Sequence, residues 1–192
     1  EKGEIVGFLG PNGAGKTTTM RILTAFYPPT EGEAEVAGFS VTKQADEVKK
    51  NIGYLPESPP VYPEMSVESY LKYILELKKV PRPDRKNHLE WSLQKCGLWD
   101  RRRSVISTLS RGYRQRVGLA QAVIHRPPVI ILDEPTVGLD PIQIREIRDL
   151  IQEFRQEHTL MLSTHILSEV TAVCNRAIII KSGSIVHQQA LQ

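Results

Sequence analysis

The sequence IVGFLGPNGAGKTTTM occupies residues 5–20 and predicts three elements in direct succession. Residues 5–9 are apolar or small, as in a short buried strand, and residues 17–26 have the spacing of an amphipathic helix. The apolar face of that helix consists of Met20, Leu23 and Phe26. Between strand and helix lies GPNGAGKT, which fits the phosphate-loop pattern G-x-x-x-x-G-K-S/T.

This loop carries the groups that hold a nucleotide's phosphates. Its glycines let backbone N–H groups converge on an anion, and the following helix N-terminus adds a partial positive charge. We expect the Lys16 ammonium to reach the β- and γ-phosphates and the Thr17 hydroxyl to ligate Mg²⁺. The candidate phosphate-binding residues are Gly10, Pro11, Asn12, Gly13, Ala14, Gly15, Lys16, Thr17 and Thr18.

Composition places the chain among globular proteins. Of its 192 residues, 40% are hydrophobic and 24% are charged, which excludes disordered, collagen-like and coiled-coil classes. No apolar run approaches the roughly 18 residues of a membrane span. Only two cysteines occur, Cys96 and Cys174, which fits a reducing compartment and excludes a disulfide scaffold.

The positive charge is concentrated in one stretch. Residues 78–116 contain 12 basic and 3 acidic residues, a local charge of +9 in a chain whose net charge is +3. Such a stretch can face a nucleic acid, an anionic lipid or a bound nucleotide, or it can be a solvated helical surface. Composition alone does not choose among these.

Apolar runs and helical spacing alternate along the remaining chain. A helix capped by Ser66 has an apolar face of Val67, Tyr70, Leu71, Ile74 and Leu77. We expect strands at residues 52–55, 129–132, 159–163 and 177–180, edge strands at 33–36, 40–41 and 184–186, and helices at 46–51, 67–79, 84–95, 112–125, 141–154 and 167–174. The alternation predicts an α/β fold: a mostly parallel sheet flanked by helices, an inserted helical subdomain and a small antiparallel β edge.

Two further segments carry polar groups suited to phosphate chemistry. VIILDE, at residues 129–134, is a buried strand that ends in two carboxylates. Because neighbours on an extended segment point opposite ways, Asp133 can hold Mg²⁺ while Glu134 polarises an attacking water. LSRGYRQR, at 109–116, precedes a helix that Ser110 can cap. It is either a second anion site, with Gly112 permitting close approach, or an ordinary N-cap.

The order of these motifs resembles that of the ATP-binding cassette (ABC) ATPases over nearly the whole chain. The set comprises the phosphate loop, LSRGYRQR shortly before VIILDEP, GLD at 138–140 and a lone His165 after a strand. YLPES at 54–58 and LSRGYRQR resemble the ATPase subunits of ABC-2-type bacterial exporters, including gliding-motility-type ones. The resemblance implies a P-loop NTPase fold and a single ABC ATPase domain over residues 1–192. Its core would be about 1–59 and 111–192, with the helical signature subdomain at about 60–110.

The resemblance also implies a role for each motif residue within one site. Lys16 and Thr17 match the Walker A pair that binds ATP and Mg²⁺. Asp133 and Glu134 match the Walker B metal-shell residue and the catalytic carboxylate. His165 matches the switch histidine that contacts the γ-phosphate.

Other motif residues would act across a dimer. Ser110 and Gly112 match the signature, which in this family contacts the γ-phosphate held by the opposite subunit, and Asp140 matches the loop that crosses the interface. The implied partners are a second ABC ATPase subunit, arranged head-to-tail, and an integral membrane permease.

The chain departs from the family pattern at three places. Glu57 stands where the family usually has Gln, and its carboxylate can ligate Mg²⁺ or hold water near the phosphates. The signature reads LSRGY rather than LSGGQ, so Arg111 and Tyr113 differ. The aromatic residue that stacks on adenine in the family would precede Glu1, so we expect this chain to be a fragment of a longer protein.

The resulting prediction is an ATP-binding and ATP-hydrolysing subunit of an ABC transporter. It would lie at the cytoplasmic face of the cell membrane, peripheral through the permease, with no nucleic-acid partner. The alternative is a soluble ABC ATPase acting on DNA or ribosomes, which the basic stretch keeps open. Against it, Lys16 and Ser110 are 94 positions apart, too close for the long coiled coil of DNA-repair relatives, and the chain holds one cassette. A P-loop kinase is disfavoured by the signature and by His165.

Overall fold

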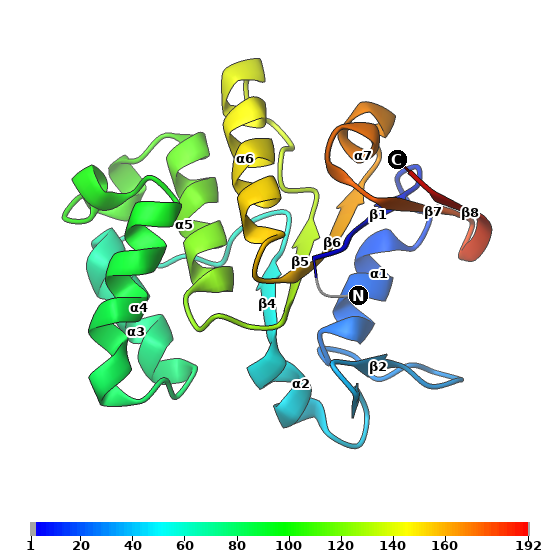
Figure 1. The fold of residues 1–192 in the computed structure, drawn as a ribbon, viewed down its shortest axis with the longest axis horizontal. Helices are drawn as coiled ribbons and strands as arrows, with labels where there is room; N and C mark the ends of the chain where they lie inside the picture. The colour runs from blue at the N-terminus through cyan, green and yellow to red at the C-terminus, as the bar shows by residue number, and fades with distance from the viewer. Residues whose placement is uncertain (1–2, 192) are drawn as a thin grey trace.

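A six-stranded sheet forms the centre of the protein (Figure 1), in a computed structural model that describes residues 3–191. The strand order is β4 (Ile52–Leu55), β5 (Val129–Asp133), β6 (Thr159–Thr164), β1 (Ile5–Leu9), β7 (Arg176–Lys181) and β8 (Ser184–Ala190). The first five strands are parallel, and β8 pairs antiparallel with β7. Parallel strands place their carboxyl ends at one edge, where the loops after β1, β5 and β6 meet.

Helices cover both faces of the sheet. The described chain contains α1 (Lys16–Leu23), α2 (Ala45–Asn51), α3 (Val67–Leu77), α4 (Arg82–Lys95), α5 (Arg111–Val123), α6 (Pro141–Phe154) and α7 (Leu167–Val173), with short 3-10 turns at Trp99–Arg101 and Ile106–Thr108. In Figure 1, α6 and α7 lie above the strands and α1 and α2 lie below them.

Alternation along β1 accounts for this layering. Gly7 faces α7, where an added Cβ would lie 2.7 Å from a Val170 methyl carbon. Phe8 points to the opposite face and belongs to an apolar cluster with Met20 of α1. Successive strand residues point to opposite faces, so one strand supports both helical layers.

Helices α3, α4 and α5 pack together beside β4 and β5 (Figure 1). Their buried side chains join the main core, which runs from Leu55 of β4 to Leu71 of α3 and Leu93 of α4. Ser66 caps α3 as predicted, because its hydroxyl accepts the Ser69 backbone N–H. None of the helices in residues 3–191 combines the length and apolar character that a membrane crossing requires.

The predicted fold class is confirmed, including its small antiparallel part, and two local predictions are wrong. Helix α1 ends at Leu23, so Phe26 lies beyond it and is 66% exposed. Leu77 was expected to face inward but is 61% exposed, and Leu75 is buried in its place. Strands β2 (Glu35–Val36) and β3 (Phe39–Ser40) pair only with each other within the described residues, as a separate two-stranded sheet.

Candidate functional site

The backbone conformation of the phosphate loop depends on its glycines. Gly13 and Gly15 have φ values of 79° and 106°, in the left-handed region that favours glycine. Gly10 packs against β7, where an added Cβ would lie 2.5 Å from the Ile180 carbonyl oxygen. Helix α1 begins directly at Lys16, and its first-turn N–H groups have no acceptor within the helix. The loop therefore presents donors and a helix N-terminus to an anion.

The Lys16 ammonium is buried in the loop and surrounded by oxygen atoms. Its Nζ donates to the carbonyl oxygens of Gly10, at 2.8 Å, and Pro11, at 3.3 Å. It also lies 3.3 Å from Oε1 of Glu134, and both side chains are more than 90% buried. A buried charge needs such partners because leaving water is costly. The loop thus fixes one positive charge at the place where the motif predicts phosphates.

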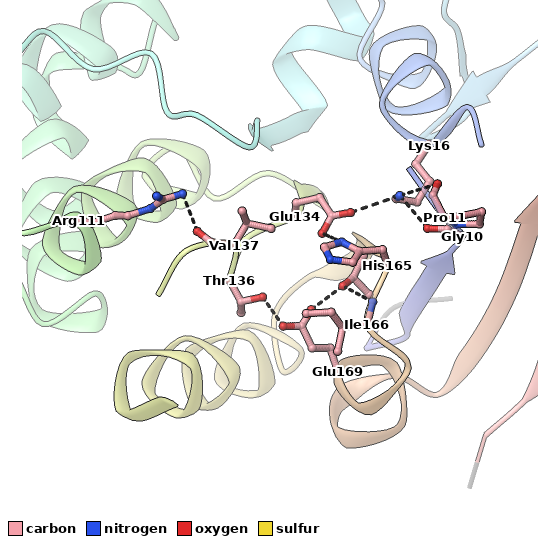
Figure 2. A network of polar contacts seen from close by, with 11 residues as sticks. Gly10, Pro11, Lys16, Arg111, Glu134, Thr136, Val137, His165, Ile166 and Glu169 are labelled. Atoms are coloured by element: carbon pink, nitrogen blue, oxygen red, sulfur yellow. Dashed lines mark hydrogen bonds and ion pairs between the residues drawn. The ribbon is translucent and has the colours of Figure 1, made fainter. Parts of the chain in front are cut away.

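Glu134 lies between this lysine and His165 (Figure 2). Its Oε2 is 2.9 Å from Nδ1 of His165, while Oε1 faces Lys16. Strand β5 ends at Asp133, and Glu134 has φ = 49°, which is left-handed backbone. The prediction that Asp133 and Glu134 are both extended is therefore wrong at Glu134. The turn at Glu134, whose N–H donates to the Ser163 carbonyl, redirects its side chain.

Asp133 is the second buried carboxylate of the site. It is 1% exposed, and its Oδ1 has no hydrogen-bond donor within the described part of the chain. Burial raises the pKa of the neighbouring Tyr54 to about 12, and the negative charge of Asp133 contributes to this rise. A buried carboxylate oxygen without a donor is a ligand suited to a divalent cation.

A cleft of about 330 Å³ connects Lys16, Glu134 and His165. It is lined by Asn12, Gly13, Gly15, Lys16, Thr17, Thr18, Glu57, Glu134, Val137 and His165. The fold thus brings most of the phosphate loop together with Glu57 from the segment after β4, Glu134 from the loop after β5 and His165 from the loop after β6. Of these lining residues, only Val137 was absent from the sequence-based candidates.

Seven candidates do not line this cleft within residues 3–191: Gly10, Pro11, Ala14, Asp133, Ser110, Gly112 and Asp140. The last three belong to helix starts outside the phosphate loop. The Ser110 hydroxyl accepts the Tyr113 N–H at 3.4 Å and caps α5. Asp140 Oδ1 accepts the N–H groups of Ile142 and Gln143 and caps α6. Gly112 packs against the Gln143 side chain, where an added Cβ would lie 2.6 Å from its Cδ atom. One chain therefore presents a phosphate loop and, apart from it, an exposed signature turn.

The unusual signature residue Arg111 joins that turn to the loop after β5. Its Nη2 donates to the Val137 carbonyl at 2.8 Å (Figure 2). Gly138, at φ = 71°, lies under the same guanidinium, which an added Cβ would meet at 2.3 Å. Further along α5, the buried Gln115 amide donates to the Pro135 carbonyl. The start of α5 is thereby fixed to the segment that follows Glu134.

A family profile described as ABC transporter matches residues 1–137. The chain belongs to this family. It is 40% identical over 190 residues to the uncharacterized ABC transporter ATP-binding protein YhcH of Bacillus subtilis, covering 98% of this chain and 61% of YhcH. It is 39% identical to the ABC transporter ATP-binding protein NatA of Bacillus subtilis, covering all of this chain and 79% of NatA.

Solved ABC structures share the fold. The ATP-binding cassette MJ0796, solved as a dimer in a post-hydrolysis state bound to ADP and Pi, superposes with a TM-score of 0.88 at 26% identity. The match covers all of this chain and 87% of MJ0796. CbiO1 from Clostridium perfringens, part of the ABC transporter complex cbiONQ, gives a TM-score of 0.89 at 26% identity and covers 99% and 78% of the two chains.

One buried part of this ABC site is missed by sequence reasoning. Glu169 of α7 contacts the hydroxyls of Thr136 and Thr164 (Figure 2). In the sequence it resembles any acid in the first turn of a helix, where the helix dipole favours negative charge. Only its 2% exposure reveals that it faces the protein interior.

Proposed function

We propose that this chain is the ATP-binding and ATP-hydrolysing subunit of an ABC transporter. The observation that carries the proposal is the contact series from Lys16 through Glu134 to His165 at the edge of the phosphate-loop cleft. It supplies a cation for phosphate oxygens, a carboxylate for water and a ring nitrogen for the γ-phosphate. These are the groups that phosphoryl transfer to water requires, since catalysis rests on positioning and electrostatics.

Each group has a defined task in this proposal. When phosphates enter, Lys16 donates to their oxygens in place of the Gly10 and Pro11 carbonyls. Glu134, released from the ammonium, accepts a hydrogen bond from the attacking water and orients it toward the γ-phosphorus. His165 remains beside Glu134 and contacts the γ-phosphate. Glu57 lines the same cleft and holds water or metal near the phosphates.

The residues present also fit Mg²⁺. Asp133 offers a buried carboxylate oxygen without a donor among the described residues, and Thr17 and Glu57 line the cleft with oxygen atoms. Within residues 3–191 no three His, Cys, Asp or Glu side chains form a metal-binding cluster. Mg²⁺ is commonly bound by one or two carboxylates together with substrate phosphates, so this sparse set is appropriate. The ion would neutralise charge on the phosphates.

We further infer that two cassettes act head-to-tail. Ser110, Gly112 and Asp140 belong to exposed helix starts that lie apart from the cleft of their own chain. The N-terminus of α1 already serves the phosphates there, so a second helix N-terminus is useful to a facing subunit. The dimer of the similar cassette MJ0796 supports this arrangement.

A groove of about 510 Å³ is our candidate for the permease contact. It lies between the end of α1, helix α3 and helix α5, and its lining includes Phe26, Tyr27, Pro56, Pro60, Leu77 and Lys78. Phe26 and Leu77 are the two apolar residues whose exposure the sequence did not predict. Exposed apolar side chains that meet in one groove are typical of an interaction site. The permease would hold the subunit at the cytoplasmic face of the membrane.

This groove also supports the proposed division of the chain. It lies between helix α3, within residues 60–110, and the end of α1 in the nucleotide-binding core. The basic charge of the helical part does not require a nucleic acid, because several of its cations have acidic partners. The pairs are Arg85–Glu76, Lys95–Glu153 and Arg116–Glu146.

Complementation between two inactive variants tests the proposal in the full-length protein. A mixed dimer of Lys16→Ala and Ser110→Arg chains has one composite site with both lesions and one with neither. If Ser110 acts across the interface, the mixture recovers ATPase activity that each variant lacks alone. Ser107→Arg, at an exposed serine three residues earlier, is the control and should keep activity. No recovery, with mixed dimers confirmed by tag pull-down, contradicts the arrangement.

A further inference from the structure

Glu169 is a buried carboxylate on the short helix α7. It is 2% exposed, although it lies in the first turn of a helix that borders the cleft-forming loops. Its Oε1 accepts a hydrogen bond from the Thr136 hydroxyl, and its Oε2 accepts one from the Thr164 hydroxyl at 2.6 Å. A buried carboxylate is costly unless it is hydrogen-bonded, so these two hydroxyls are what stabilises it.

The two threonines lie next to the two hydrolytic groups, one in the loop after β5 and one at the end of strand β6. Thr136 follows Glu134 by two residues, in the loop after β5. Thr164 ends β6 and directly precedes His165, and its hydroxyl oxygen also accepts the Ile166 N–H at 3.1 Å. His165 therefore lies between Thr164 and Ile166, which the Thr164 hydroxyl joins to each other (Figure 2).

One carboxylate therefore joins both segments behind the Glu134–His165 contact. One oxygen of Glu169 accepts from Thr136 in the loop after β5, and the other accepts from Thr164 at the end of β6. The two segments therefore cannot separate without leaving a buried acceptor unpaired. On the other side of the loops, the same pair of segments meets through the 2.9 Å contact between Glu134 and His165. The Glu134–His165 contact and the Glu169 hydrogen bonds therefore connect the two segments at two separate places.

We propose that Glu169 is a positioning residue for ATP hydrolysis, which fixes the His165 loop against the Glu134 loop. This rests on the proposed function, because the geometry matters where both side chains face one γ-phosphate. Through Thr164, at the end of β6, Glu169 also anchors α7 to a strand against which that helix packs, so stability and positioning must be separated by experiment. The hydroxyls that Glu169 does engage flank the two reacting groups.

Conservative variants separate positioning from stability. Glu169→Gln keeps the shape but replaces one acceptor by a donor, and Thr136→Val removes one hydroxyl. We expect each to lower kcat by about 10- to 100-fold, since displacements of about 1 Å cost that much, with the KM for ATP changed less than about threefold. Thr136→Ser retains the hydroxyl and should restore most of kcat. Thr171→Val, on the exposed side of α7, is the matched control.

A double variant tests whether Glu169 acts through His165. In a His165→Ala background, Glu169→Gln should lower kcat by less than about threefold, because the group that it positions has gone. Independent, multiplicative losses in kcat overturn the proposal. So does a Thr136→Ser variant as impaired as Thr136→Val, or a Glu169→Gln variant with the kcat of the wild type.

The ring of His165 gives a readout that does not depend on hydrolysis. In the nucleotide-free protein, Glu169→Gln should shift the ¹⁵N resonances of the His165 ring, whereas Thr171→Val should leave them in place. Unshifted resonances overturn the positioning role. A wild-type protein without ATPase activity would instead overturn the proposed function, and the His165 resonances would still decide whether Glu169 orients this ring.

Discussion

Replacing Glu134 by Gln should destabilise the nucleotide-free protein and stop hydrolysis. The substitution preserves the shape of the side chain and removes its charge. In the structure that charge lies 3.3 Å from the buried Lys16 ammonium and 2.9 Å from the His165 ring. The variant therefore leaves Lys16 buried with only the Gly10 and Pro11 carbonyls and a neutral amide around it.

The size of this effect follows from burial. At 3.3 Å and an effective dielectric constant of about 20, the attraction of the pair is roughly 5 kcal/mol. Much of it is offset by the cost of burying both charges, and hydrogen bonds to charged groups contribute about 1.5–3 kcal/mol net. We expect a loss of about 2 kcal/mol in the free energy of unfolding, or a fall in Tm of roughly 4–8 °C for a chain of this size.

Glu153→Gln provides the matched control. Lys95 and Glu153 are also 3.3 Å apart, but their side chains are 34% and 53% exposed. An exposed pair contributes about 0–1 kcal/mol, so this variant should unfold within about 2–4 °C of the wild type.

Thermal unfolding with and without MgATP, together with phosphate release, is the assay. When ATP is added, its phosphates bind Lys16 in place of the lost carboxylate. The difference in Tm between Glu134→Gln and the wild type should therefore become smaller. The variant should also bind ATP without releasing phosphate and remain a dimer on gel filtration. Equal destabilisation by Glu134→Gln and Glu153→Gln would refute the buried-pair argument. Normal phosphate release would refute the role of Glu134.

Three further predictions concern separate groups. Lys16→Ala should abolish ATP binding in a fluorescent-nucleotide titration, because the loop loses its only cationic side chain, and wild-type affinity would contradict this. Glu57→Gln should raise the Mg²⁺ concentration for half-maximal activity, and an unchanged titration would count against metal contact. Burial, with a contribution from nearby positive charge, lowers the pKa of His125 to about 3, against about 6.5 when unfolded. Its contribution to stability is therefore constant above about pH 6.5 and falls by about 1.4 kcal/mol per pH unit as the pH decreases from 6.5 toward 3. His125→Gln should weaken the dependence of the unfolding free energy on pH between about 6.5 and 3. The same slope in the variant and the wild type would contradict a lowered pKa of His125.

Local sequence determined the elements and the phosphate loop. GPNGAGKT predicts its own conformation because glycines at Gly13 and Gly15 supply left-handed backbone in place. Ser66 and Ser110 cap their helices as expected, since a cap needs only the three residues that follow it. The parallel sheet likewise follows from alternating apolar runs and amphipathic helices.

The composition of the cleft was predicted from the order of motifs rather than from local chemistry. A lone histidine after a strand is uninformative alone, and His165 acquires a meaning only beside Glu134. Glu57 follows β4 and Lys16 follows β1, two strands that are separated in the sheet by β5 and β6. The expectation that Glu57 lies near Lys16 came from the family resemblance, because the sequence pattern alone gives no distances between residues.

Tertiary structure alone decided the remaining features. Pairing of β1 with β6, in which Ile5 meets Leu160, sets the His165 loop beside the phosphate loop across 155 positions of sequence. The left-handed turn at Glu134, the burial of Glu169 and the exposure of Phe26 and Leu77 all depend on what packs against them. Periodicity reports which residues share a face of one helix or strand. It does not report which distant segment covers that face, and burial, charge pairing and the shape of the cleft depend on that covering segment.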